Sequence, residues 1–157
     1  AEFIFIPGSL EAIQDLTRAG FRVILITNQS AVNRGIISLE RLIDIHARMT
    51  EAIRAAGGDI TGIFFCPHRP EEGCDCRKPR PGLIRTAQKE YGIDLSEAVM
   101  VGDSVKDMQC AENIGCGRRV LVLTGNGVET RDRLYRENRA PDFVAENLKK
   151  AADWIMG

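Results

Sequence analysis

The sequence predicts an α/β fold in which a parallel β-sheet carries helices on both faces. Short apolar segments rich in β-branched residues alternate along the chain with longer segments whose apolar residues recur every three or four positions. The 157 residues suffice for one ordinary hydrophobic core and are too few for two domains. We therefore expect residues 1–157 to form a single domain.

Four apolar segments are the predicted strands. Residues 21–26 are almost all apolar, which is typical of a strand buried on both faces of a parallel sheet. The others are residues 60–65, 98–102 and 120–123. Residues 3–6 form one more apolar run, closed by Pro7-Gly8, which we interpret as an edge segment or a docking strand.

Six amphipathic segments are the predicted helices. They are residues 10–18, 39–56, 81–91, 105–114, 129–138 and 148–156. Ser9 and Ser38 stand where the first two helices need an N-cap side chain, and Pro81 suits the first turn of the third. We expect Trp154, in the last helix, to pack inward.

The composition excludes several classes of partner. The 21 lysines and arginines nearly balance the 22 aspartates and glutamates, and aromatic residues make up only 6% of the chain. Such a chain has neither a global field for nucleic acid or anionic lipid nor a base-stacking surface. No apolar run approaches the ~18 residues of a membrane span, and no segment has the pattern of a signal peptide. We expect a cytoplasmic monomer whose partner is neither nucleic acid nor a membrane.

Three thiols and one imidazole lie close together in the middle of the chain. Cys66 and His68 form one pair, Cys74 and Cys76 form another, and one residue separates the members of each pair. Folded against each other, the two pairs would supply the four ligands of a closed tetrahedral zinc site. Because a closed site leaves no open position for a substrate, we expect this zinc to be structural.

A disulfide between two of these thiols, or free thiols in a loop, are the alternatives. Cys110 and Cys116 lie in a helix-like segment and a Gly-rich turn, so the five cysteines do not suggest a disulfide framework. The predicted metal loop ends in Arg77-Lys78, which places two cations beside a thiolate ligand. This placement indicates an anionic ligand.

Polar side chains follow the ends of the predicted strands. Thr27-Asn28 follows the first strand, Arg77-Lys78 follows the second strand and its metal loop, and Asp103 follows the third. Ligands of open parallel sheets bind at this edge, so we expect a phosphate site in which Asp103 holds Mg²⁺. Taken singly, Thr27 could simply end a strand, Asp103 could cap a helix and Lys78 could be a solvated charge.

These residues carry a resemblance to a known superfamily. Thr27-Asn28, Lys78 and the sequence Gly-Asp-Ser-Val-Lys-Asp at 102–107 resemble motifs II, III and IV of the haloacid dehalogenase (HAD) phosphatases. The metal stretch is similar to that of two of its families, the heptose bisphosphate phosphatases of lipopolysaccharide core synthesis and the histidinol phosphatases. Residues 28–30, 79–82 and 120–125 resemble the heptose family more, so histidinol phosphatase is the second choice.

The resemblance implies a Rossmann-like HAD fold and Mg²⁺-dependent hydrolysis of a phosphate monoester through an aspartyl-phosphate. The implied substrate is D-glycero-β-D-manno-heptose 1,7-bisphosphate, converted to the 1-phosphate. Thr27 and Lys78 would stabilise the phosphoryl group, and Asp103 would bind Mg²⁺. Substrate contacts are implied for Thr27, Asn28, Gln29, Ser30, Arg77 and Lys78. Zinc would be held by Cys66, His68, Cys74 and Cys76.

The chain departs from the superfamily pattern in two places. Position 104 is Ser where these families usually carry Lys or Arg, and the chain contains no Asp-x-Asp. In the superfamily that motif supplies the nucleophile and the general acid, on a central strand between those ending in Thr27 and Asp103. We expect about 20 to 30 further N-terminal residues in the natural protein, roughly one strand and its loop. The 157 residues alone should be inactive.

A function of another class is the alternative. The absent nucleophile is compatible with an inert zinc-stapled module that binds a phosphorylated ligand without hydrolysing it. Zinc-mediated binding of nucleic acid is disfavoured by the balanced charge and the few aromatic residues.

Overall fold

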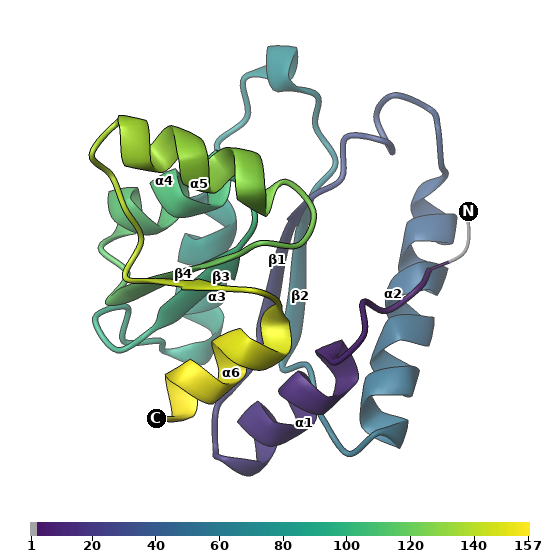
Figure 1. Cartoon of the computed structure of the whole chain (residues 1–157). Coiled ribbons are helices and arrows are strands. Elements are labelled where there is room, and N and C mark those ends of the chain that lie inside the picture. The colour runs from purple at the N-terminus through teal and green to yellow at the C-terminus, as the bar shows by residue number, and fades with distance from the viewer. Residues whose placement is uncertain (1–2) are drawn as a thin grey trace.

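A computed structural model describes residues 3–157 of the chain (Figure 1). The elements in chain order are α1 (Ser9–Arg18), β1 (Ile24–Asn28), α2 (Leu39–Ala55), β2 (Gly62–Cys66), the 3-10 turn η1 (Pro70–Glu72), α3 (Gly82–Tyr91), β3 (Val99–Gly102), α4 (Val105–Ile114), β4 (Arg118–Val122), α5 (Gly127–Arg136), β5 (Phe143–Ala145) and α6 (Leu148–Met156). The predicted alternation of strands and helices is confirmed.

The strands form two parallel sheets. β1 pairs with β2, from Ile24 opposite Gly62 to Asn28 opposite Cys66. β3, β4 and β5 form the second sheet in that order, also in parallel. The parallel pairing was predicted, but as a single sheet. Within residues 3–157, no strand is hydrogen-bonded between β1 and β3.

Helices cover both faces of the larger sheet, as predicted. Val120 and Val122 of β4 pack with residues of α1 and α6 in one buried cluster. Leu121, between them in the sequence, points to the opposite face and packs against Met108 and Leu134. Because successive strand side chains point to opposite faces, this alternation places α1 and α6 on one side and α4 and α5 on the other (Figure 1).

Several predicted boundaries shift. β1 begins at Ile24 rather than residue 21 and includes Thr27 and Asn28, which therefore lie within the strand rather than after it. β5 was not predicted, since three residues carry too little pattern. Residues 3–6 form no strand, and Phe5 packs instead against the cluster that contains Ile53.

The helix termini were partly predicted. Ser38 caps α2 by accepting a hydrogen bond of 3.1 Å from the backbone N–H of Arg41. Ser9 does not cap α1, because it is already the first helical residue and Gly8, with φ of 86°, is the N-cap. Pro81 is the N-cap of α3 rather than part of its first turn. Trp154 is half-buried and stacks on Phe143 with ring centroids 4.9 Å apart.

Across residues 3–157, none of the helices is both long enough and apolar enough to cross a membrane.

Candidate active site

The ammonium group of Lys78 lies between β1 and α4. Its Nζ donates a 3.2 Å hydrogen bond to the carbonyl oxygen of Ile26 in β1 and lies 2.5 Å from Oδ1 of Asp107 in α4. The side chains of Lys78 and Asp107 are only 13% and 8% exposed. A largely buried cation is thus held between the middle of β1 and the first turn of α4, the helix that follows β3.

Asp107 is a site residue whose role the sequence did not reveal. Its Oδ2 accepts hydrogen bonds of 3.2 Å from the backbone N–H groups of Asp103 and Ser104. A Cβ atom at Gly102 would lie 2.5 Å from Oδ2 of Asp107, so only glycine leaves room for this contact. The signal for Asp107 lay in the motif at 102–107, but its partner is 29 residues away in the chain.

Ser104 has a local structural role. Its Oγ accepts a 3.1 Å hydrogen bond from the backbone N–H of Asp107, and Asp107 caps in return, so the two residues form a capping box at the start of α4. The serine found where related families carry a cation therefore serves as an N-cap.

The carboxylate of Asp103 lies beyond the end of β3. Its Oδ2 accepts a 2.8 Å hydrogen bond from the backbone N–H of Asn126, and Asn126 Nδ2 lies 3.4 Å from the same oxygen. Oδ2 is thus engaged by the loop before α5, which the sequence did not connect to the site. Carboxylate oxygens are the ligands that Mg²⁺ prefers.

Two side chains at the end of β1 and just after it make hydrogen bonds within the protein. Gln29 Nε2 donates a 3.0 Å hydrogen bond to the Thr27 hydroxyl. Asn28 contacts the backbone of Lys78 through both ends of its side-chain amide. Lys78 and Asp103 are therefore connected, since Asp107 contacts both Lys78 and the Asp103 backbone, whereas Thr27 is linked to Lys78 through its chain neighbour Asn28.

The two other predicted substrate contacts have local partners. Ser30 Oγ accepts a 3.3 Å hydrogen bond from Arg34 Nε. Arg77 Nη1 donates a 3.4 Å hydrogen bond to the carbonyl oxygen of His68, which ties this half-buried cation to the metal loop. Neither side chain contacts Lys78 Nζ.

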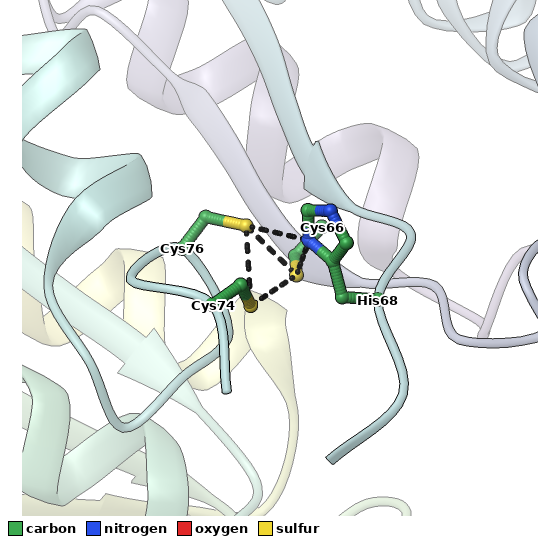
Figure 2. Close-up of side chains that lie close together, drawn as sticks. All are labelled: Cys66, His68, Cys74 and Cys76. Carbon is green, nitrogen blue, oxygen red and sulfur yellow. Dashed lines mark hydrogen bonds between the residues drawn. The ribbon is translucent and has the colours of Figure 1, made fainter. Parts of the chain in front are cut away.

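The four predicted metal ligands form one cluster (Figure 2). Cys66 Sγ lies 2.9 Å from Cys76 Sγ and 3.5 Å from Cys74 Sγ. His68 Nδ1 lies 3.3 Å from Cys66 Sγ and 3.2 Å from Cys76 Sγ. All four ligand atoms lie within 4.8 Å of one another, and the three cysteines are free rather than paired in a disulfide.

This donor set fits zinc. Sulfur atoms at ~2.3 Å from one tetrahedral ion are separated by about 3.8 Å. The separations from Cys74 Sγ, 3.5 and 3.6 Å, approach this value, whereas Cys66 Sγ and Cys76 Sγ, 2.9 Å apart, would have to move apart around the ion. Partial burial, together with its hydrogen bonds to the other two thiols, raises the pKa of Cys76 to about 12. For Cys74, burial by itself raises the pKa, but hydrogen bonds from the Arg77 N–H and the neighbouring thiols outweigh it and lower the pKa to about 7. A cation among the sulfurs would favour thiolates at all three positions.

The chain resembles known proteins over nearly its whole length. The HAD-hydrolase-like family model matches residues 75–151. The D-glycero-β-D-manno-heptose-1,7-bisphosphate 7-phosphatase of Bordetella bronchiseptica is 46% identical over 157 residues, which cover 99% of this chain and 85% of that protein. The protein of the same name from Pseudomonas aeruginosa is 47% identical over 129 residues, covering 82% of this chain and 72% of that protein.

Solved structures agree with these relatives. The crystal structure of the B. bronchiseptica D,D-heptose 1,7-bisphosphate phosphatase complexed with magnesium and phosphate matches with a TM-score of 0.89 and 41% identity, over 98% of this chain and 84% of that one. The Burkholderia thailandensis enzyme matches with a TM-score of 0.73 and 32% identity, over 97% and 86% of the two chains. The chain therefore belongs to the D-glycero-β-D-manno-heptose-1,7-bisphosphate 7-phosphatase family of HAD-like hydrolases.

Proposed function

We propose that the protein is a Mg²⁺-dependent phosphatase that removes the 7-phosphate of D-glycero-β-D-manno-heptose 1,7-bisphosphate and leaves the 1-phosphate. The names of the relatives support this substrate. The structural observation that carries the proposal is the Lys78 ammonium, held between Ile26 and Asp107 at the edge where Thr27 and Asp103 also lie.

Each residue of this edge has a distinct task in the proposed reaction. The Thr27 hydroxyl and the Lys78 ammonium hydrogen-bond the phosphoryl oxygens and offset the charge that develops on them. Asp103 would hold Mg²⁺, which supplies further positive charge to the phosphoryl group when bound. Ser30 and Arg77, whose side chains hydrogen-bond to Arg34 and to the His68 carbonyl, would bind the sugar and its second phosphate.

The nucleophile of this reaction belongs to a strand that completes the sheet. A cavity of about 500 Å³ is lined by Ile24 and Ile26 of β1 and by Val99 and Met100 of β3, the two strands that have no partner between them. A parallel strand pairing with both edges would hydrogen-bond their backbone groups, including the Ile26 carbonyl oxygen that Lys78 contacts, and would cover their apolar side chains. A segment outside these 157 residues that carries Asp-x-Asp at the end of such a strand would place its first carboxylate beside Lys78.

The metal loop has a mechanical role in this proposal. Zinc bound by Cys66, His68, Cys74 and Cys76 closes the loop immediately before Arg77 and Lys78. Because the ligands fix the loop backbone, the two cations are held in place without zinc touching the substrate.

Turnover of defined substrates tests the proposal. The full-length protein is incubated with the heptose 1,7-bisphosphate and, in parallel, with histidinol phosphate, each with Mg²⁺ added or Mg²⁺ omitted. We expect Mg²⁺-dependent phosphate release from the heptose substrate, with the 1-phosphate retained as seen by ³¹P NMR. Preferred hydrolysis of histidinol phosphate would reassign the substrate, and binding without release of phosphate would favour a phosphate-binding module.

A further inference from the structure

The side-chain amide of Asn28 is bound at both ends by one residue. Its Oδ1 accepts a 3.0 Å hydrogen bond from the backbone N–H of Lys78, and its Nδ2 lies 3.3 Å from the Lys78 carbonyl oxygen, to which it donates. Asn28 is the last residue of β1 and is half-buried, whereas Lys78 ends the metal loop 50 residues later. The amide thus joins a strand to the loop that carries the phosphate-binding cation.

An asparagine amide suits this contact because it offers a donor and an acceptor side by side. Aspartate would keep the acceptor for the Lys78 N–H but would set a carboxylate oxygen against the Lys78 carbonyl. Alanine would remove both hydrogen bonds. The contact therefore depends on the amide itself, and not on side-chain size alone.

The ammonium and the backbone of Lys78 are held by different residues. Asp107 and the Ile26 carbonyl hold Nζ, and Asn28 holds the main chain from which the side chain extends. We infer that Asn28 is a positioning residue for Lys78 and does not itself grip the sugar phosphate, an inference that rests on the proposed phosphatase function. The next residue, Gln29, also makes a contact within the protein, since its side chain donates a hydrogen bond to the Thr27 hydroxyl.

Two substrates of different size separate positioning from substrate binding. An aryl phosphate such as p-nitrophenyl phosphate presents one phosphoryl group to Lys78 and lacks the sugar hydroxyls and the second phosphate. In Asn28→Ala and Asn28→Asp, we expect kcat to fall by the same factor for both substrates, about tenfold or more, because Lys78 is misplaced in both reactions. A raised KM for the heptose bisphosphate, with the aryl phosphate hydrolysed at the wild-type rate, would overturn the inference.

Hydrogen exchange gives a readout that does not need turnover. The Lys78 amide proton should exchange at least about tenfold faster in Asn28→Ala, whereas Asn28→Asp, which keeps the acceptor, should retain most of the protection. Asn33→Ala is the matched control, because Asn33 lies in the next loop and its side chain contacts Glu72 rather than Lys78. We expect this control to leave both the Lys78 exchange rate and kcat unchanged.

The two measurements can refute the proposed function and the positioning role separately. If the wild-type protein turns over neither substrate, the proposed function is wrong, and the exchange of the Lys78 amide alone decides whether Asn28 holds this residue. Unchanged exchange at Lys78 in Asn28→Ala would refute the positioning role whatever the enzyme kinetics show.

Discussion

The Lys78 ammonium and the Asp107 carboxylate form a largely buried ion pair, 2.5 Å apart, that bridges the two sheets of the molecule. Lys78 also donates to the carbonyl oxygen of Ile26 in β1, and Asp107 belongs to the helix that follows β3. A buried pair of this kind fixes the direction of the ammonium, which a solvated lysine would not have. In the proposed reaction it aims the cation at the phosphoryl group.

Removing the charge of Asp107 should leave the buried Lys78 ammonium without its ion-pair partner. Asp107→Asn keeps an oxygen for the Asp103 and Ser104 N–H groups but leaves a buried cation without its partner, so the free energy of unfolding should fall by about 3 kcal/mol. Adding Lys78→Met should restore much of this loss while abolishing turnover. Urea denaturation at neutral pH measures the first effect, and phosphate release measures the second.

A surface pair provides the control for that experiment. Glu137 pairs with Arg133 and Arg139 on the surface beyond the end of α5, so Glu137→Gln should have only a small effect on stability and leave turnover unchanged. Equal stability losses in Asp107→Asn and Glu137→Gln would contradict the special role given to the Lys78 pair.

Removing one thiol of the metal cluster should lower turnover indirectly, through the position of the two cations that follow the cluster. Cys76→Ala is expected to lose bound zinc and to lower turnover, since Arg77 and Lys78 follow Cys76 directly and would no longer be held. Metal content by mass spectrometry and steady-state kinetics measure the two effects. Cys116→Ala, outside the cluster, should retain zinc and full activity, and unchanged kcat and KM in Cys76→Ala would count against the mechanical role of the loop.

The N-cap hydrogen bond of Ser104 should make a measurable contribution to the free energy of unfolding. Ser104→Ala removes the acceptor for the Asp107 N–H and should lower the free energy of unfolding by about 1 kcal/mol. Ser104→Thr keeps a hydroxyl and should recover most of that loss. If chemical denaturation shows that alanine and threonine have the same effect, the cap is not the reason for serine at this position.

Glu112 should make stability depend on acidic pH. Its carboxylate accepts hydrogen bonds from Arg139 and Arg119, and the Arg139 contact is the main reason that the pKa of Glu112 is lowered. A lowered pKa in the folded state means that the stabilisation is full above the unfolded glutamate pKa of about 4.3 and is lost as the pH falls through the folded value.

Glu112→Gln should therefore be less stable than the wild type at neutral pH, by about 1 kcal/mol after solvent screening, and the gap should be smaller at an acidic pH below the unfolded glutamate pKa of about 4.3. Urea titrations at the two pH values measure the difference. A stability gap that stays constant with pH would assign the effect of this substitution to packing rather than to charge.

The sequence predicted local features better than distant ones. The cluster of three cysteines and one histidine could be predicted because all four residues fall within eleven positions, and β1 to β4 because apolar runs mark buried strands. The pairing of Asp107 with Lys78, the contact of Asn126 with Asp103 and the separation into two sheets depend on distant segments meeting in space. No local pattern encodes them, and β5, with three residues, was too short to be recognised.

Phosphate release and intact mass, measured on one sample of the purified protein, test most directly whether the nucleophile comes from an additional strand between β1 and β3. A sample of 17.4 kDa, the mass of these 157 residues, should release no phosphate from the heptose bisphosphate, whereas a longer natural form that carries Asp-x-Asp should hydrolyse it. Turnover by the 17.4 kDa chain alone would contradict the account.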